Sequence, residues 1–285
     1  GGLGDANYMR GRMITAHGYF DDCINLARQH GFTRIEVSNI YMRGNTLQFR
    51  NRLEAALEDC DVAGALARKV GDQRAEMVAE GGGKGWVYYD MGRTGEAFTH
   101  SETGLDLARA ISAGRFEAMI LVWLAKLRAL DGQSAEAVRL AEEAVAIARD
   151  SSIAFTGPMA LSALALVTDD DEQRREALAE GERILQERCV SHNYLYFYRD
   201  AIEVSLQDRA WDEVERYAAA LEAYTAEEPL PWTDIFIARG RALAAHGQGL
   251  RDAALTAELE RLRDEIVESG HGLALSAVEA ALAET

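Results

Sequence analysis

The sequence predicts an all-α protein, a superhelix in which antiparallel helix pairs are stacked in chain order. Three observations point to this class. The 285 residues include only 3 prolines, so helices can run with few interruptions. Alanine, leucine, glutamate and arginine, which favour helices, are abundant, and alternating β-branched runs typical of strands are missing. The chain also repeats with a period near 40 residues.

The repeat is visible when the chain is aligned on one residue, usually small, in the first helix of each unit. Successive anchors lie 40, 41, 40, 40, 37 and 38 residues apart, at Gly4, Gly44, Gly85, Ala125, Ala165, Ile202 and Gly240. Glycine or asparagine can end a helix in a left-handed conformation. The positions 7 residues after the anchors are Gly11, Asn51, Gly92, Gly132, Glu172, Arg209 and Gly247.

The second helix of each unit carries a further pair of positions, 12 and 16 residues after the anchor. In the first unit these are Ala16 and Phe20, which would fill the contact between the two helices. In the last unit Asp252 and Thr256 stand there instead, so the pattern is weaker at that end.

These positions resemble the tetratricopeptide repeat, in which a small residue in the first helix lets the second approach closely. The usual period is about 34 residues, so we expect helices about a turn longer, or longer loops. One repeat domain of seven helix pairs is predicted, a tetratricopeptide-like α-α solenoid with a capping helix over Leu273–Ala283. The expected units are 1–31, 32–71, 72–112, 113–151, 152–190, 191–228 and 229–270, followed by the cap at 271–285. The first pair looks shortened, which together with the absence of an initial methionine suggests a fragment of a longer chain.

Charge and composition exclude several classes of partner. With 30 basic and 47 acidic residues the net charge is −17, which disfavours nucleic acid and anionic membrane surfaces. Apolar stretches such as Ala118–Ala125 fall far short of the roughly 20 residues of a membrane span. Three widely spaced cysteines, Cys23, Cys60 and Cys189, are expected as reduced, small buried groups, which favours a cytoplasmic location.

No motif for catalysis, cofactor binding or metal binding is found. A phosphate loop, a dinucleotide fingerprint and a nucleophile elbow are absent from the sequence, and the six histidines lack zinc-site spacing. The acidic run at 169–172 is expected to cap the next helix. We therefore predict a protein domain that is not an enzyme and holds neither cofactor nor metal.

The run Gly81-Gly82-Gly83-Lys84-Gly85 is the most unusual segment of the chain. It lacks the serine or threonine that follows the lysine of a phosphate loop, and no strand precedes it. By repeat register it falls in the middle of a helix, where each glycine costs up to about 1 kcal/mol relative to alanine. We therefore expect a weak or kinked helix. If Gly82 and Gly83 lie inside a regular helix, replacing them with alanine should raise stability, whereas a loss of stability would indicate a turn or a tight contact.

The first helices of such a superhelix line its concave side, where a partner would bind. Counting from the anchors places nine candidates there: Tyr41, Asn45, Trp86, Tyr89, Trp123, Lys126, Tyr196, Arg199 and Arg241. Aromatic residues and arginine are enriched at binding hot spots. The alternative is that the tryptophans pack between helix pairs and that the cations are solvated or ion-paired. The run His192–Asp200 is the densest in aromatic rings and is favoured as a contact segment, with a wide seam between pairs as the alternative.

Several segments carry a narrower resemblance that covers essentially the whole chain. They include Gly2-Leu3-Gly4-Asp5-Ala6, Arg10-Gly11-Arg12-Met13, His30-Gly31-Phe32, Gln73-Arg74-Ala75-Glu76-Met77, Phe197-Tyr198-Arg199-Asp200-Ala201-Ile202-Glu203, Glu228-Pro229-Leu230-Pro231-Trp232 and Phe236-Ile237-Ala238-Arg239-Gly240-Arg241. They resemble the C-terminal helical-repeat regions of large bacterial proteins that carry a class III adenylate/guanylate cyclase domain and an AAA-type ATPase domain. The resemblance implies that cyclase and ATPase machinery lies upstream, and that these 285 residues are a regulatory or sensory arm.

The main functional prediction is a non-catalytic scaffold that binds a protein or peptide partner, or the upstream domains, through a concave aromatic groove. The alternative is a small-ligand sensor like the helical-repeat region of an ATP-dependent transcription activator. An open channel lined by Tyr41, Trp86 and Arg199 would favour the peptide, and a closed apolar cavity would favour the small ligand. The oligomeric state stays open.

Overall fold

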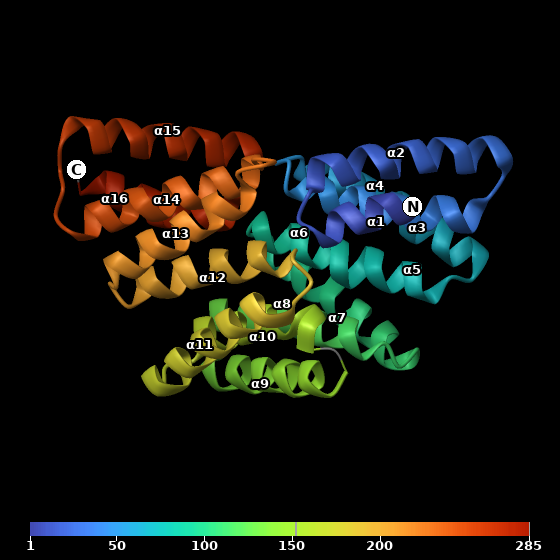
Figure 1. The fold of residues 1–285 in the computed structure, drawn as a ribbon, viewed down its shortest axis with the longest axis horizontal. Coiled ribbons are helices and arrows are strands. Elements are labelled where there is room, and N and C mark those ends of the chain that lie inside the picture. Colours follow the sequence, from blue (N-terminus) through green and yellow to red (C-terminus); the bar gives the residue numbers. More distant parts are fainter. Residues whose placement is uncertain (152, 285) are drawn as a thin grey trace.

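The computed structural model describes residues 1–151 and 153–284, and within them the chain forms helices and no strand (Figure 1). The elements are α1 (Gly2–Met9), α2 (Met13–His30), α3 (Thr33–Gln48), α4 (Leu53–Val70), α5 (Gln73–Met77), η1 (Val78–Lys84), α6 (Gly85–Asp90), α7 (Thr94–Ala110), α8 (Gly114–Leu130), α9 (Ser134–Ser151), α10 (Ile153–Val167), α11 (Asp171–Arg188), α12 (Asn193–Gln207), α13 (Trp211–Thr225), α14 (Pro231–Gly247), α15 (Ala253–Ser269), η2 (Gly272–Ala274) and α16 (Leu275–Ala283).

The elements pair in chain order, which confirms the predicted fold class. The pairs are α1–α2, α3–α4, α8–α9, α10–α11, α12–α13 and α14–α15, and the continuous helix α5–η1–α6 pairs with α7. The last helix, α16, packs on α14 and α15 as a cap. None of the helices in the described part is long and apolar enough to cross a membrane.

The turns within the pairs follow the predicted positions in five units. Gly11, Gly92 and Gly132 have φ values of 74°, 75° and 73°, and Asn51 and Arg209 have 55° and 56°. Glycine at these positions relieves the strain that a side chain meets at positive φ.

Two units depart from the predicted turn position. Gly247 is the last residue of α14, and the left-handed residue is Gly249 instead. Glu172 lies in the first turn of α11, where the Asp170 side chain accepts hydrogen bonds from the N–H groups of Glu172 and Gln173. The acidic run therefore caps α11, as predicted.

The small anchor residues bring the paired helices together. A Cβ atom added to Gly4 would lie 2.4 Å from the Phe20 ring, and one added to Gly85 would lie 2.5 Å from Ser101 Oγ. Both contacts join the anchor to the residue 16 positions later, as the repeat predicted. Larger residues at these anchors would push the helices apart.

The glycine run departs from a regular α-helix, in line with the expected weak or kinked helix, and the departure takes the form of a π-helix. It lies in η1, a π-helix in which the Gly85 N–H bonds to the Glu80 carbonyl, and every residue of η1 is buried. A Cβ atom on Gly81 would meet Ile120 at 2.7 Å, and one on Gly83 would meet Cys60 Sγ at 2.4 Å. The condition for a gain in stability with alanine, a regular helix, is therefore not met, and at Gly83 the side chain of Cys60 on α4 occupies the space that a Cβ atom would need.

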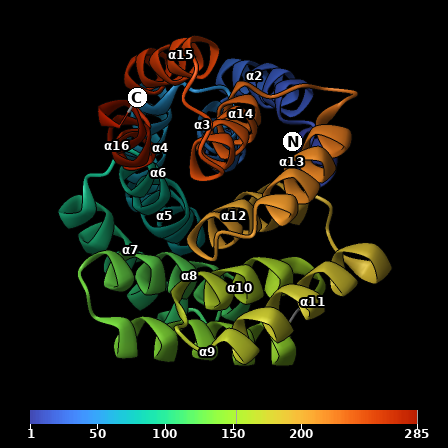
Figure 2. The same ribbon diagram turned by 90° about the vertical axis from the view of Figure 1, so that its left-hand side faces the viewer.

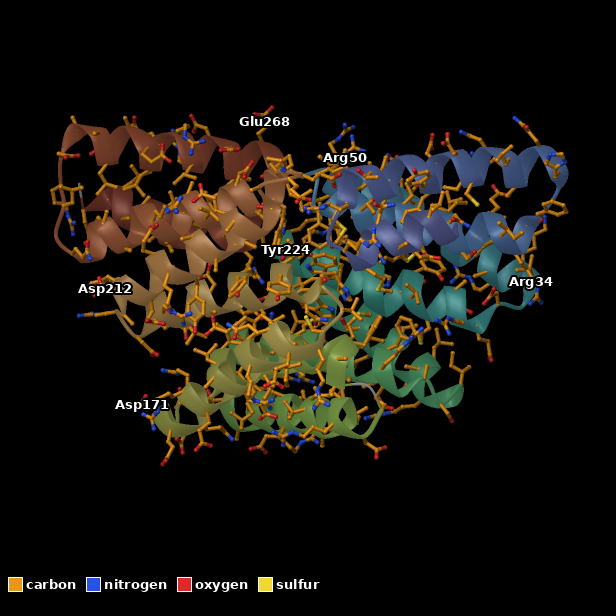
Figure 3. The ribbon with its side chains drawn as sticks, viewed as in Figure 1. Arg34, Arg50, Asp171, Asp212, Tyr224 and Glu268 are labelled. Carbon is orange, nitrogen blue, oxygen red and sulfur yellow. The ribbon has the colours of Figure 1, made fainter. Side chains whose placement is uncertain are left out.

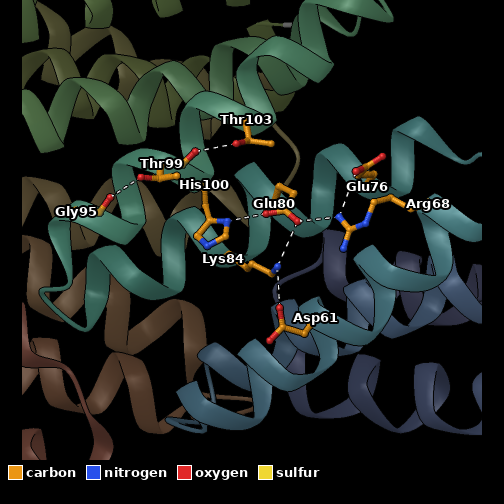
Figure 4. A network of polar contacts seen from close by, with 9 residues as sticks. All are labelled: Asp61, Arg68, Glu76, Glu80, Lys84, Gly95, Thr99, His100 and Thr103. Atoms are coloured by element: carbon orange, nitrogen blue, oxygen red, sulfur yellow. Dashed lines mark hydrogen bonds and ion pairs between the residues drawn. The ribbon is translucent and has the colours of Figure 1, made fainter.

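A polar network on η1 and its neighbours surrounds Glu80 (Figure 4). One carboxylate oxygen accepts from Lys84 Nζ at 3.2 Å, and the other lies 2.6 Å from His100 Nδ1. Lys84 Nζ also lies 2.7 Å from Asp61. Burial alone would raise the pKa of Glu80, but the hydrogen bond from His100 and the charge of Lys84 lower it to about 2. The network holds the wide π-turn against α4 and α7.

Pro158 interrupts the hydrogen bonds of α10 and frees a carbonyl for the next pair. Proline has no N–H, so it cannot bond to the carbonyl of Ala154 four residues earlier. The Val190 N–H donates a hydrogen bond to the Ala154 carbonyl at 2.8 Å instead, and Asn193 Nδ2 donates one to the Phe155 carbonyl at 2.8 Å. These bonds fix the start of α12, and with it the side chain of His192.

The superhelix closes on itself. Figure 2 shows the chain running around the molecule, from blue helices at the top through teal, green, yellow and orange back to red beside the blue. The His192 N–H bonds to the Met9 carbonyl at 3.2 Å, and the Trp232 N–H bonds to the Phe49 carbonyl at 3.2 Å. Tyr224, at the centre of Figure 3, donates its hydroxyl to the Arg10 carbonyl at 2.8 Å. Helices of the first two pairs therefore contact those of the last two.

Most rings of the aromatic run at the start of α12 pack against α13, the second helix of the same pair. Tyr194 stacks on Tyr224 with ring centroids 4.6 Å apart, and Phe197 and Tyr198 pack against Tyr217. His192 and Tyr196 face the interior of the ring instead, as described below. No residue of the run is exposed, so the expectation of exposed rings is wrong, while its role in binding a partner stays a prediction.

The three cysteines are free thiols in the structure. Cys60 is fully buried, as expected, but Cys23 and Cys189 are only half-buried.

Candidate functional site

A cavity of about 330 Å³ opens on the inner wall of the ring. Its lining comes from the first helices of six pairs: Asp5, Tyr8, Met9, Tyr41, Met42, Asn45, Arg74, Val78, Gly82, Trp86, Arg115, Phe116, Met119, Trp123, Phe155, His192 and Tyr196. Because α1 and α12 both contribute, closure of the ring is needed to complete the cavity.

Aromatic rings form a large part of the cavity wall. The indoles of Trp86 and Trp123 are stacked, with centroids 5.6 Å apart and planes 7° from parallel. Tyr196 lies edge-on to both, at 5.1 Å from Trp86 and 6.1 Å from Trp123. Such flat, rigid surfaces bind planar or apolar groups at little cost in conformational entropy.

Three buried polar atoms of lining residues have no hydrogen-bond partner within the described chain. They are Asn45 Oδ1, Trp123 Nε1 and His192 Nδ1. Their residues are 8%, 2% and 4% exposed. A buried polar atom without a partner costs about 1–3 kcal/mol, so a bound molecule that supplied partners would be favoured.

The ionisation of the buried lining residues follows from their desolvation. Burial lowers the pKa of His192 to about 4, so the imidazole is neutral at pH 7. Burial raises the pKa of Tyr8 to about 12, and a hydrogen bond with Tyr196 partly offsets this. Both groups are therefore uncharged hydrogen-bonding groups.

Charged side chains occur at the rim of the cavity. Arg74 and Arg115 come from α5 and α8, and Asp5 comes from α1. Burial, together with the positive charge of Arg74, lowers the pKa of Arg115. Burial raises the pKa of Asp5.

A second depression of about 310 Å³ lies one helical turn further along the same inner helices. Tyr89, Lys126 and Arg199 line it, each 3 residues after Trp86, Trp123 and Tyr196 respectively. Their charges are neutralised within the protein: Lys126 Nζ lies 2.6 Å from Asp200, and Arg199 lies 3.7 Å from Asp90.

The nine residues predicted from the sequence thus divide into three groups. Five of them line the first cavity: Tyr41, Asn45, Trp86, Trp123 and Tyr196. Tyr89, Lys126 and Arg199 lie at the second depression. Arg241 belongs to neither, because it faces α13 and pairs with Glu215 and Glu222 at 2.9 and 2.8 Å.

Sequence reasoning missed other lining residues that share a recognisable spacing. Met119, Phe116 and Arg115 lie 4, 7 and 8 residues before Trp123, on the same face of α8. Extending the stripe from each predicted tryptophan toward the start of its helix would have found them. Tyr8 and His192 could not be found in this way, because ring closure brings them to the cavity.

Other features of the described residues point to no second site. No group of three or more histidine, cysteine or acidic side chains is placed to hold a metal ion within residues 1–151 and 153–284. A wider depression on α11–α13 is lined by charged residues that pair with each other, such as Arg216 with Glu182 at 2.7 Å.

The fold and the lined inner wall define a tetratricopeptide-like helical-repeat scaffold. The chain belongs to the family described as MalT-like TPR region, whose model matches residues 2–262. No curated protein matches the chain. Among solved structures, it is similar to the Rap conjugation gene regulator of the plasmid pLS20 in complex with the Phr* peptide. The TM-score is 0.66 at 18% sequence identity, over 93% of this chain and 72% of that chain, so this likeness concerns the fold.

Proposed function

We propose that this chain is a non-catalytic sensor domain that binds a small ligand in the aromatic cavity of the inner wall. The observation that supports this most is the shape of the cavity. The cavity has a volume of about 330 Å³ and is lined by the first helices of six pairs. Its volume is within the range of small-molecule sites, about 300–1,000 Å³. Arg199 lines the neighbouring depression and not the cavity of Tyr41 and Trp86, which favours the small ligand over an extended peptide in one open channel.

Ligand binding would be coupled to closure of the ring. Tyr8 and Met9 from α1 meet Tyr196 from α12 and its N-cap residue His192 at the cavity, and the Tyr8 and His192 rings lie 5.7 Å apart. A ligand that contacts both sides binds the closed ring better than an opened one and shifts the population toward it. The shift between the open and the closed ring can then be transmitted to a linked domain or to a docked partner protein.

A peptide ligand is the second candidate, and the solved Rap complex with the Phr* peptide supports it. A peptide would place one or two side chains in the cavity rather than run through the ring.

We also propose that the chain is the regulatory arm of a longer cytoplasmic protein with a nucleotide cyclase and an ATPase domain. The resembling segments support this, and sequencing the DNA upstream of Gly1 tests it: an open reading frame without a phosphate-loop ATPase would exclude that parent.

The cavity is tested with a neutral aromatic probe, N-phenyl-1-naphthylamine, whose fluorescence rises in apolar surroundings. We expect saturable binding to the wild-type protein. Binding to Met42→Trp should be at least about tenfold weaker, because the indole ring fills part of the cavity. Leu26→Trp adds the same ring at a residue that is 57% exposed and should bind as the wild type does. Equal binding by all three proteins would show that the probe does not occupy this cavity and would count against the proposal.

A further inference from the structure

Two arginines, Arg74 and Arg115, lie near each other in the lining of the cavity. Neither Arg74 nor Arg115 has a carboxylate within 4.0 Å among the described residues. Arg43, Arg109 and Arg216 on other surfaces each pair with two carboxylates, at 2.6–2.9 Å. Exposed arginines such as Arg175 and Arg188 also lack an ion-pair partner among the described residues, but Arg74 and Arg115 differ from them because both line one cavity.

Aromatic side chains hold both guanidinium groups in place. Arg74 Cζ lies 5.1 Å and Arg115 Cζ lies 5.0 Å from the centre of the Phe116 ring. Arg115 also lies 4.8 Å from the Phe155 ring, and Arg74 hydrogen-bonds with the Tyr41 hydroxyl. The rings orient the guanidinium groups but leave the donors of Arg115 without an acceptor in the described chain.

The two positive charges at the cavity exceed the negative charge there. Asp5 is the only carboxylate among the described residues that line the cavity, and no arginine lies within ion-pair distance of it. Partial burial raises the pKa of Asp5, but its single negative charge is in any case smaller than the two positive charges of Arg74 and Arg115. A bound anion would relieve the repulsion between Arg74 and Arg115.

We infer that the ligand of this cavity is an organic anion with an aromatic body. A carboxylate or phosphate group would be bound by Arg74 and Arg115, and the planar body would lie against Trp86 and Trp123. Guanidinium groups bind both kinds of anion through paired hydrogen bonds. The unpartnered Asn45 Oδ1 and His192 Nδ1, further inside, would select polar groups on the body of the ligand. This inference rests on the proposed function and narrows its ligand class.

Two probes that differ by one charge test the inference. The anion 8-anilino-1-naphthalenesulfonate has the same aromatic body as N-phenyl-1-naphthylamine and carries a sulfonate in addition. We expect the wild-type protein to bind the anionic probe more tightly than the neutral one. In the double variant Arg74→Gln/Arg115→Gln, affinity for the anionic probe should fall at least about tenfold, while affinity for the neutral probe stays within about twofold.

A matched control separates local binding from net charge. Arg175 and Arg188 on α11 are exposed and have no ion-pair partner among the described residues. The double variant Arg175→Gln/Arg188→Gln removes the same two charges and should bind both probes as the wild type does. Circular dichroism spectra of all variants check that the helices are retained.

The outcomes distinguish the inference from the proposed function. Cavity-dependent binding of the neutral probe, with no effect of Arg74→Gln/Arg115→Gln on the anionic probe, would overturn the anion assignment and leave the sensor proposal standing. Loss of affinity in both double variants would also overturn it, since net charge would then explain binding. Displacement of the anionic probe by 1-naphthoate or by 1-naphthyl phosphate identifies the preferred anion, and displacement by neither contradicts the inference.

Discussion

Glu228 caps helix α2 at Ile14, although 214 residues separate the two residues. Its carboxylate accepts the N–H of Ile14 at 2.8 Å and that of Thr15 at 3.2 Å. Helix α2 has no side-chain cap from its own N-cap residue, Arg12. The loop between α13 and α14 therefore satisfies donors at the start of the second helix of the chain, and this contact lies across the seam that closes the ring.

Replacing Glu228 with alanine should loosen that seam. We expect the free energy of unfolding to fall by about 1 kcal/mol, as for loss of a helix cap, and the amides of Ile14 and Thr15 to exchange faster with solvent. Hydrogen exchange read by NMR or mass spectrometry measures this. The control is Glu227→Ala, whose carboxylate is 82% exposed and forms only a surface ion pair with Arg12. Equal exchange in both variants would show that Glu228 does not hold the seam.

Replacing Lys126 with methionine should destabilise the protein strongly. The ammonium of Lys126 and the carboxylate of Asp200 are each about 1% exposed, and Ser162 also donates to Asp200 at 2.9 Å. Removing one partner leaves a buried charge without its closest counter-ion, which typically costs about 3–5 kcal/mol. Urea denaturation should show that Lys126→Met/Asp200→Asn is more stable than Lys126→Met alone. If the double variant is the less stable one, the two residues do not act as a pair.

The glycines of η1 should respond differently to alanine. Gly83→Ala should cost about 1–3 kcal/mol, because its Cβ atom would lie 2.4 Å from Cys60 Sγ. Gly82→Ala should lie within about 1 kcal/mol of the wild type, since its nearest neighbour at 3.1 Å is the flexible end of Met119. Adding Cys60→Ala should recover much of the loss at Gly83. Thermal unfolding of the wild type, Gly82→Ala, Gly83→Ala and Gly83→Ala/Cys60→Ala measures these differences. Equal melting temperatures for the two single variants would show that Cys60 does not crowd a side chain at position 83.

Stability should depend on pH through His192. Burial lowers the pKa of its folded form to about 4, while the unfolded chain titrates near 6.5. Between these values the unfolded state binds the additional proton, so stability falls as pH falls from 6.5 to 4, by about 3 kcal/mol in total. His192→Gln should remove this part of the slope, and His30→Gln, at an exposed histidine, should leave it. Denaturant melts at pH 4, 5, 6 and 7 measure the difference, and parallel profiles for wild type and His192→Gln would exclude the effect.

The periodic part of the structure could be predicted from the sequence because each repeat contacts its neighbours through a fixed pattern. The pairing of Gly4 with Phe20, the turns at Gly11 and Gly92 and the capping helix follow from that pattern. Five residues of the cavity wall were also predicted, since Trp86 and Trp123 occupy inward positions on first helices. Closure of the ring could not be predicted, because contacts such as those of Tyr8 with His192 depend on the accumulated superhelical twist. The π-helix at Gly81–Gly83 was missed for a similar reason: its glycines match neighbours on α4, α7 and α8.

The contact of Glu228 with Ile14 also limits how the array can evolve. Open solenoids lengthen or shorten by duplicating or losing a unit, because a new unit needs only its two neighbours. In this ring an additional hairpin of about 40 residues would move the α13–α14 loop away from α2, and a lost hairpin would leave a gap at the same place. The number of hairpins between α2 and that loop is therefore constrained by geometry, and homologues that retain the seam should differ in loop length and sequence rather than in copy number.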